Sequence, residues 1–247
     1  MRRIRVTVSY DGTDYHGWQV QPELATIQGT MESVLGEIEG APVHVDASGR
    51  TDAGVHALAQ VAAFTLDNPI PVENLRKAMN RLLPRDIRVL DAAEAAGDFH
   101  PRYAAVAKTY EYRILRAEIC SPFERRYVYH HPYPLDEPRM VDLAPLLEGE
   151  HDFSAFAASD ERDELGFSKV RRIFSSMLCR HGDRLIYRLR GSGFLKHMVR
   201  NIVGVLLEAG KGNLDRDEWL ARLHPGCPIP AGPTAPARGL FLVSVEY

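Results

Sequence analysis

The sequence is poor in cysteine and contains no long apolar run. Its three cysteines, Cys120, Cys179 and Cys227, lie far apart and outside any C-x-x-C pair, so we expect reduced thiols and not a disulfide framework. No stretch approaches the roughly 18 consecutive apolar residues of a membrane span. The N-terminal residues, MRRIRVT, hold no apolar signal-peptide core. We therefore expect a cytoplasmic protein.

The spacing of metal ligands is missing as well. The ten histidines form no H-x-x-x-H pair and have no cysteine partner at the spacing of a zinc site. The adjacent pair His130 and His131 is expected in a loop. We accordingly expect no metal site.

The net charge of the whole chain is −3, which does not indicate nucleic-acid binding, but the charge is unevenly distributed. Residues 162–200 hold ten Lys or Arg against three acidic residues, a local charge of +7. Such a sector suits a phosphate-binding face, and on charge alone arginines guarding strand edges explain it almost as well. Its basic residues are Arg162, Lys169, Arg171, Arg172, Arg180, Arg184, Arg188, Arg190, Lys196 and Arg200.

The chain of 247 residues, 45% of them hydrophobic, can bury one large core or two small cores around a shared cleft. Alternating apolar residues predict a strand that ends at Asp11-Gly12, and a helix follows between an N-cap at Thr26 and a stop at Gly40. Strands at 42–47 and 58–66, a helix at 72–83 and a strand at 87–92 complete a β-α-β-β-α-β order.

The same order begins again near residue 104. It comprises a strand to 115, a helix at 137–148, strands at 169–179 and 184–190, a helix at 194–210 and a strand at 239–246; the Pro- and Gly-rich stretch 224–239 is expected to be a surface loop. We expect an α+β fold with two ferredoxin-like halves, 1–103 and 104–247. They would join into an extended antiparallel sheet with helices on one side and a central cleft.

The loop between the strands at 42–47 and 58–66 carries the chemistry. Its sequence is SGRTDAGVH, residues 48–56, and the G-x-x-x-x-G spacing is not a phosphate loop because Val55-His56 stands where Lys-Ser/Thr is required. Arg50 and Asp52 are two apart, so in an extended segment the guanidinium would keep the carboxylate ionised as a nucleophile or base. No second acid lies nearby, which argues against a two-carboxylate glycosidase. The alternative role for Asp52 is an Asx-turn or N-cap paired with Arg50.

Six sequence blocks in this order resemble the tRNA pseudouridine synthase A family, over essentially the whole length. The block GRTDAGVH is long and specific, whereas each of the others alone would be weak. The blocks are YDGT with GWQ (10–13 and 17–19), GRTDAGVH (49–56), DFH (98–100), KTY (108–110), FLKHMVRN (194–201) and GLFL (239–242).

The resemblance implies a uridine isomerase that acts on tRNA positions 38–40, in the anticodon stem-loop. Asp52 matches the catalytic aspartate, which attacks C1′ of the ribose or assists cleavage through the proton at C2′. Arg50 would fill the stack that the flipped base leaves or pair with Asp52, and Tyr110 would stack on the target base. Lys108 shares a strand face with Tyr110, although an aromatic strand in the core explains that spacing equally well. Family members are homodimers, so we expect a homodimer.

Further contacts with the substrate are expected from two segments. Lys196, His197 and Arg200 lie on or beside the polar face of the helix at 194–210, where the preceding Gly191-Ser192-Gly193 would open an anion site at the helix start; a solvated face is the ordinary alternative. Trp18 and Gln19 are expected to touch RNA, the alternative being a hairpin turn with a packed tryptophan.

Two rival functions stay open on the sequence. A tandem RNA-binding module would share the element order, but no strand has the Lys/Arg-Gly-Phe/Tyr-Gly/Ala-Phe-Val pattern of an RNA recognition motif. A nucleoside hydrolase would also cleave a glycosidic bond, but it would release free base, whereas an isomerase leaves the mass of the RNA unchanged.

Overall fold

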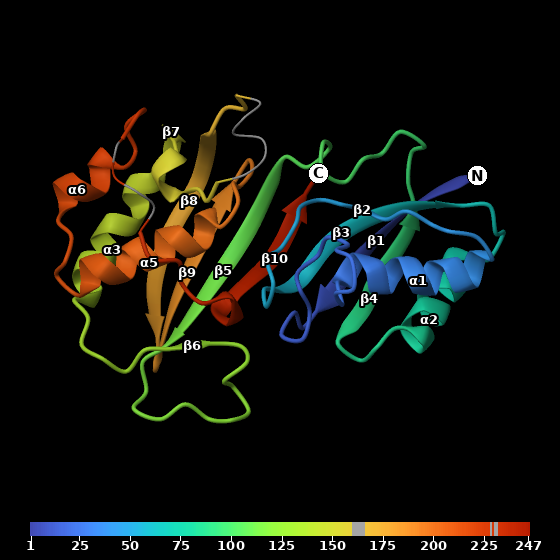
Figure 1. The fold of residues 1–247 in the computed structure, drawn as a ribbon, viewed down its shortest axis with the longest axis horizontal. Helices are drawn as coiled ribbons and strands as arrows, with labels where there is room; N and C mark the ends of the chain where they lie inside the picture. The colour runs from blue at the N-terminus through green and yellow to red at the C-terminus, as the bar shows by residue number, and fades with distance from the viewer. Residues whose placement is uncertain (160–165, 228, 230–231) are drawn as a thin grey trace. The chain divides into compact units, whose positions relative to one another are not determined.

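The computed structural model describes residues 1–159, 166–227, 229 and 232–247 (Figure 1). The chain forms two compact units, Met1–Val106 with Phe241–Tyr247, and Ala107–Leu240. The first boundary lies three residues beyond the expected one at 103, and the last strand returns to the first unit. Each unit mixes helices and strands, in agreement with the expected class.

The sheet of the first unit has the strand order β4-β1-β3-β10, with β2 also pairing with β3. The pairings are antiparallel except that of β10 with β3, which is parallel and sets Phe241 opposite His56. The start of β3 is therefore held from both sides. The strands are β1 (Arg2–Tyr10), β2 (Asp46–Ala47), β3 (His56–Leu66), β4 (Ile87–Glu94) and β10 (Leu240–Glu246).

Two helices cover one face of this sheet, α1 (Ile27–Glu39) and α2 (Val72–Leu82) (Figure 1). The predicted caps of α1 are confirmed: the Thr26 side chain accepts a hydrogen bond from the backbone N–H of Gly29, and Gly40 is left-handed with φ 78°. The alternate residues of β1 that were expected inside are buried, and so are inward-facing residues of both helices. The fully or almost fully buried core includes Ile4, Val6, Val8, Met31, Leu35, Phe64, Leu75 and Met79.

The sheet of the second unit has the strand order β5-β9-β8-β7, and β6 pairs with β5 in parallel. The predicted strands at 169–179 and 184–190 are confirmed, with a hairpin turn at 182–183. The strands are β5 (Ala107–Leu115), β6 (Tyr129–His130), β7 (Gly149–Asp152), β8 (Val170–His181) and β9 (Arg184–Gly191).

The helices of the second unit are shorter than the periodicity predicted. The expected helix at 137–148 stops at Leu143 and continues as a 3-10 turn that contains Pro145, whose ring disfavours an α-helical interior. The expected helix at 194–210 begins only at Met198, because His197 adopts φ 59°. The helical elements are α3 (Glu137–Leu143), η1 (Ala144–Leu147), η2 (Ser154–Phe156), α5 (Met198–Gly210), α6 (Arg216–Ala221) and η3 (Ala237–Gly239).

Within the described residues, the helices are all too short or too polar to cross a bilayer.

Candidate active site

The loop at 48–55 is anchored at its N-terminal end by a buried glutamine of β3. The Ser48 hydroxyl donates to the side-chain oxygen of Gln60 at 2.6 Å, and the Gln60 amide donates to the backbone carbonyl of Gly49 at 2.8 Å. Both Ser48 and Gln60 are 0% exposed. A hydrogen bond between buried partners holds position because breaking it leaves a desolvated polar group.

The middle of the loop is held by the segment that follows β1, residues 11–18, which we call the bracing segment. The backbone N–H of Trp18 donates to the backbone carbonyl of Thr51 at 3.0 Å, and the backbone N–H of Gly54 donates to that of Tyr15 at 3.2 Å. These two bonds fall on either side of Asp52. The backbone at Asp52 is thus fixed from the N-terminal and the C-terminal side.

Two glycines let the bracing segment approach this closely. A Cβ on Gly12 would lie 2.0 Å from the carbonyl oxygen of Val55, and one on Gly17 would lie 2.6 Å from that of Thr51. Gly17 also has φ 87°, a conformation that other residues rarely adopt. The YDGT and GWQ blocks therefore serve, in this structure, as a backbone support for the loop.

A buried hydroxyl pair adds a third contact. The phenol of Tyr10, which ends β1, lies 2.8 Å from the Thr51 hydroxyl, and both side chains are less than 8% exposed. Burial raises the pKa of Tyr10 far above its usual value, so the phenol stays protonated and neutral. No separate signal in the sequence indicates this pair, since Tyr10 fits the apolar alternation of β1.

Asp52 and Arg50 occupy different environments on the loop. Asp52 is half-buried, Thr51 is buried and Arg50 is exposed. The carboxylate is consequently carried on a fixed backbone without being sealed from solvent, while the guanidinium stands at the surface. The pairing of Arg50 with Asp52 stays a prediction.

The positions of Trp18 and Gln19 differ from each other. Trp18 is only 2% exposed and packs near Tyr10, with ring centroids 6.0 Å apart. Its burial differs from the expected contact with RNA and agrees with the alternative of a packed tryptophan. Gln19 is exposed, so its side chain lies where a substrate contact is possible.

Tyr110 and Lys108 lie on β5 in the second unit. Tyr110 is 7% exposed, and its ring meets that of Phe194 edge to face at 4.9 Å between centroids. Lys108 is half-buried. The burial of Tyr110 agrees with the alternative of an aromatic strand in the core, and its pairing with Lys108 at the site stays a prediction. Phe194 is an aromatic neighbour to which the sequence assigned no role.

Lys196, His197 and Arg200 surround the start of α5, but not as the sequence predicted. The glycines at 191 and 193 precede α5 by several residues, so they do not open its N-terminus. Lys196 is exposed and donates to the carbonyl of Ser159 at 3.3 Å. Arg200 donates to the carbonyl of Ala235 at 2.8 Å and is half-buried.

The polar face of α5 is covered and not solvated. Asn201 is 1% exposed; its amide donates to the carbonyl of Phe156 at 2.9 Å and its oxygen accepts from the Thr234 hydroxyl at 2.7 Å. A Cβ on Gly204 would lie 1.6 Å from the carbonyl oxygen of Pro233. Part of the predicted surface loop at 224–239 therefore packs against this helix.

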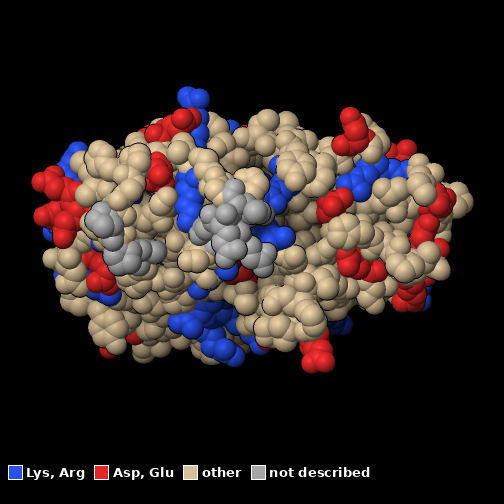
Figure 2. Space-filling model, turned by 45° about the horizontal axis from the view of Figure 1, so that its top comes forward, with Lys and Arg blue, Asp and Glu red and all other residues tan. Residues whose placement is uncertain are grey.

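The basic sector at 162–200 is partly neutralised by glutamates. Arg180, Arg184 and Arg188 form ion pairs with Glu137, Glu124 and Glu111, which come from outside the sector. Arg162, Asp163 and Glu164 lie outside the described residues. Figure 2 shows both Lys and Arg side chains and Asp and Glu side chains on the face in view.

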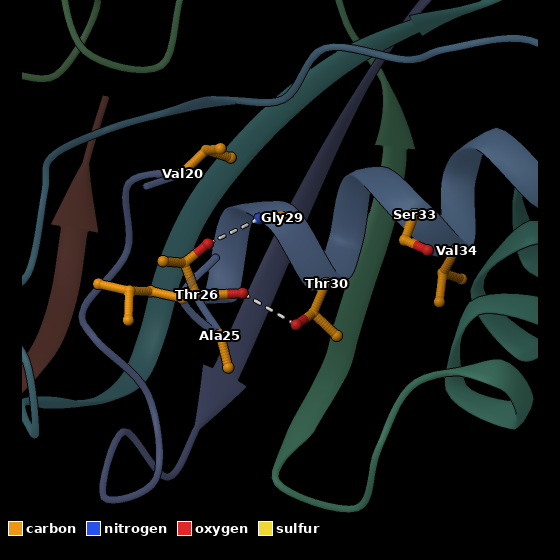
Figure 3. A pocket seen from close by; sticks show the side chains of 8 residues that line it. Val20, Ala25, Thr26, Gly29, Thr30, Ser33 and Val34 are labelled. Atoms are coloured by element: carbon orange, nitrogen blue, oxygen red, sulfur yellow. Dashed lines mark hydrogen bonds between the residues drawn. The ribbon is translucent and has the colours of Figure 1, made fainter. Parts of the chain in front are cut away.

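The depression beside α1 carries no reactive group (Figure 3). It has a volume of about 370 Å³ and is lined by residues of the 20–34 region. The Thr26 hydroxyl already caps the helix, and the Thr30 hydroxyl donates to the carbonyl of Thr26 at 2.8 Å. Among the described residues, moreover, His, Cys, Asp and Glu side chains form no group of three that could hold a metal.

Comparison with known proteins places the chain in a family. The sequence pattern of the family described as tRNA pseudouridine synthase matches residues 6–104 and 143–247. The tRNA pseudouridine synthase A of Solibacter usitatus is 68% identical over 247 residues, which is 100% of both chains. The protein of the same name from Halalkalibacterium halodurans is 47% identical over 98% of this chain and 91% of its own, and that of Geotalea uraniireducens is 44% identical over 100% of both.

These matches confirm the resemblance that the sequence blocks indicated. The first matched range contains the braced loop with Asp52, and the second contains β8, β9 and α5. The chain belongs to the tRNA pseudouridine synthase family, whose members are isomerases that convert uridine to pseudouridine in tRNA.

Proposed function

We propose that this chain isomerises uridines at tRNA positions 38–40, in the anticodon stem-loop, and that Asp52 is the catalytic residue. The observation that carries the assignment of Asp52 is the support of its loop. Two backbone hydrogen bonds from the bracing segment flank Asp52, while the carboxylate is only half-buried. A carboxylate on a fixed backbone that solvent still reaches suits a group that meets an incoming ribose.

The proposed reaction balances without a cofactor. In one route an Asp52 oxygen forms a bond to C1′ as the C1′–N1 bond breaks, and the uracil leaves with the electron pair. In the other route Asp52 removes the proton at C2′ as the same C1′–N1 bond breaks, which leaves a C1′=C2′ double bond, and the protonated Asp52 returns that proton to C2′ when C5 bonds to C1′. The uracil then turns, C5 bonds to C1′, the carboxylate is regenerated, and the C5 proton is lost while N1 gains one. The RNA keeps its mass.

A base stacked inside a helical stem is out of reach of a carboxylate. The target nucleotide must leave the stack, at a cost of a few kcal/mol. The exposed Arg50 is proposed to fill the vacated position or to pair with Asp52. Tyr110 is proposed to stack on the extruded base and to assist proton loss at C5.

Contacts with the rest of the tRNA are proposed for several basic and polar residues. Lys108, Lys196, His197, Arg200 and Gln19 are each at least partly exposed. Trp18 is proposed to act indirectly, because its backbone N–H holds the carbonyl of Thr51 and its buried ring packs near Tyr10. The partner is tRNA, and we propose that the enzyme works as a homodimer in the cytoplasm without a metal or another cofactor.

Each unit is proposed to derive from a ferredoxin-like β-α-β-β-α-β element. In the first unit, the strands β4-β1-β3-β2 are antiparallel neighbours, which is the arrangement that such an element order produces. In the second unit, β5, β9 and β8 are antiparallel neighbours in the corresponding places.

The decisive experiment compares Asp52→Asn with the wild type on unmodified tRNA transcripts. Nucleosides from the digested RNA are separated by chromatography, because pseudouridine and uridine have equal mass. We expect the variant to lose activity by about 10³-fold or more and to bind tRNA as before. Asp91→Asn, an exposed aspartate on β4, is the matched control and should be fully active.

The rival functions give different results in the same assay. A nucleoside hydrolase would release free uracil and leave RNA of lower mass. A non-catalytic module would bind tRNA and yield no pseudouridine. Wild-type activity in Asp52→Asn would reject the assignment of the catalytic residue.

A further inference from the structure

We propose that Asp11 and His56 are positioning residues that fix the catalytic carboxylate through the bracing segment. The inference rests on the proposed role of Asp52 and adds two groups that do not themselves meet the substrate. Asp11 begins the bracing segment, and His56 is the first residue of β3, directly after the loop.

The two side chains meet at one ring nitrogen in a buried place. His56 is 1% exposed, and its Nδ1 lies 3.1 Å from a carboxylate oxygen of Asp11 and 3.1 Å from the backbone nitrogen of Gly12. The imidazole also stacks on Phe241 of β10, with ring centroids 4.7 Å apart. The ring therefore cannot turn without losing contacts on several sides.

Nδ1 ties β3 to the bracing segment whichever ring nitrogen carries the proton. A ring with its proton on Nε2 alone accepts the Gly12 N–H, and a ring with a proton on Nδ1 donates to Asp11. In either case the buried imidazole makes a hydrogen bond that is costly to leave unmade.

Asp11 also fixes the backbone of the bracing segment beyond its contact with His56. Its side-chain oxygen accepts from the backbone N–H of Thr13 at 3.0 Å and from the Thr13 hydroxyl at 2.6 Å, an Asx-turn that shapes the chain after β1. Its own N–H donates to the carbonyl of Asp86 at 2.9 Å. One carboxylate thus sets the direction in which the bracing segment leaves the sheet.

The bracing segment reaches Asp52 by a short path. Tyr15 and Trp18 hold the peptide groups of Gly54 and Thr51, and the N–H of Val55 donates to the carbonyl of Asp52 itself at 3.1 Å. A shift of residues 11–18 would move the Asp52 backbone with it. Since a misplacement of about 1 Å can cost 10²-fold in rate, loosening the Asp11–His56 link should lower kcat.

The test compares His56→Leu and His56→Asn. Leucine removes Nδ1, whereas the shorter asparagine can place an amide atom where Nδ1 was. We expect His56→Leu to lower kcat for pseudouridine formation by about 10²-fold and to change KM less than about threefold, because the tRNA-binding groups lie elsewhere. His56→Asn should recover much of the loss.

The matched control is His131→Leu, which removes a 5% exposed histidine of the second unit. Thermal unfolding is measured for every variant. Equal losses of kcat in His56→Leu and His131→Leu at equal stability would overturn the proposal, because they would reflect general destabilisation. A change confined to KM, or no recovery in His56→Asn, would overturn it too.

Asp11→Ala keeps the test decisive if His56→Leu does not fold. The methyl group removes both the acceptor for Thr13 and the carboxylate facing His56. We expect a loss of about tenfold or more in kcat, and a wild-type kcat would overturn the proposal. Failure of the proposed function is distinguishable, because it would show as an active Asp52→Asn or as an inactive wild-type enzyme.

Discussion

Replacing Gly12 by alanine tests whether the bracing segment sets the position of the loop at 48–55, which carries the proposed catalytic residue. The new Cβ would lie 2.0 Å from the Val55 carbonyl oxygen, and ordinary contact begins at 3.4 Å, so one backbone must move by about 1.4 Å. The φ of Gly12 is not in the left-handed region, and the effect is therefore steric. No flexible side chain can relieve it, because both nearest atoms belong to the main chain of Val55.

The expected cost has two parts. Overpacking of this kind destabilises a folded protein by about 1–3 kcal/mol. A displacement near 1 Å next to a reacting group lowers the rate by about 10²-fold. We therefore expect Gly12→Ala to fold, to bind tRNA with nearly unchanged affinity and to lose about two orders of magnitude in kcat.

The assay is the single-turnover rate of pseudouridine formation with enzyme in excess, together with urea unfolding. Gly40→Ala is the matched control, because Gly40 has φ 78° at the end of α1 and no atom within 4 Å of the added Cβ. It should cost about 1 kcal/mol of stability through backbone strain and leave kcat intact. A wild-type rate in Gly12→Ala would refute the reasoning, as would an equal rate loss in Gly40→Ala.

Three further outcomes are expected. Tyr10→Phe should lower the free energy of unfolding by about 1 kcal/mol, because the buried Thr51 hydroxyl loses a partner; urea denaturation measures it. Burial raises the pKa of Glu137, but hydrogen bonds from Arg180 and Arg116 outweigh this and leave it lowered. Stability that depends on a lowered carboxyl pKa is present above its unfolded value and lost as pH falls through the folded value. The stability advantage over Glu137→Gln should thus be full at pH 7 and shrink below about pH 4, as urea titrations across pH would reveal. The affinity for tRNA should fall steeply as salt rises, because phosphate contacts release counterions; a flat response in filter binding would remove the phosphate-binding part of the proposal.

The elements of the fold followed from local patterns wherever those patterns were complete. The strand before Asp11-Gly12 was readable from alternation, and α1 from its apolar spacing between Thr26 and Gly40. Predictions went wrong where a single residue changed the local backbone. Pro145 turned the end of a helix into a 3-10 turn, and the left-handed His197 delayed the start of α5.

The candidate site, like the fold, was predicted from the sequence only in part. The block around Asp52 is specific enough to indicate the family from the sequence, and the family comparison confirmed it. The sequence left open whether Trp18 would be packed or would touch RNA, and it did not predict that Asn201 and Gly204 would be covered by residues 233–235. A polar helix face looks the same in sequence whether water or another segment covers it.

By itself, the sequence determined the family and most of the secondary structure, and it singled out the carboxylate that we propose to react, because these depend on residue types at short spacing. Only the tertiary structure decided what holds that carboxylate in place. Gly12, Gly17 and Asp11 are about 40 residues away from the loop they support, and Phe241 is farther still. Their roles arise from strand pairing and close backbone approach, which bring together residues that no local pattern connects.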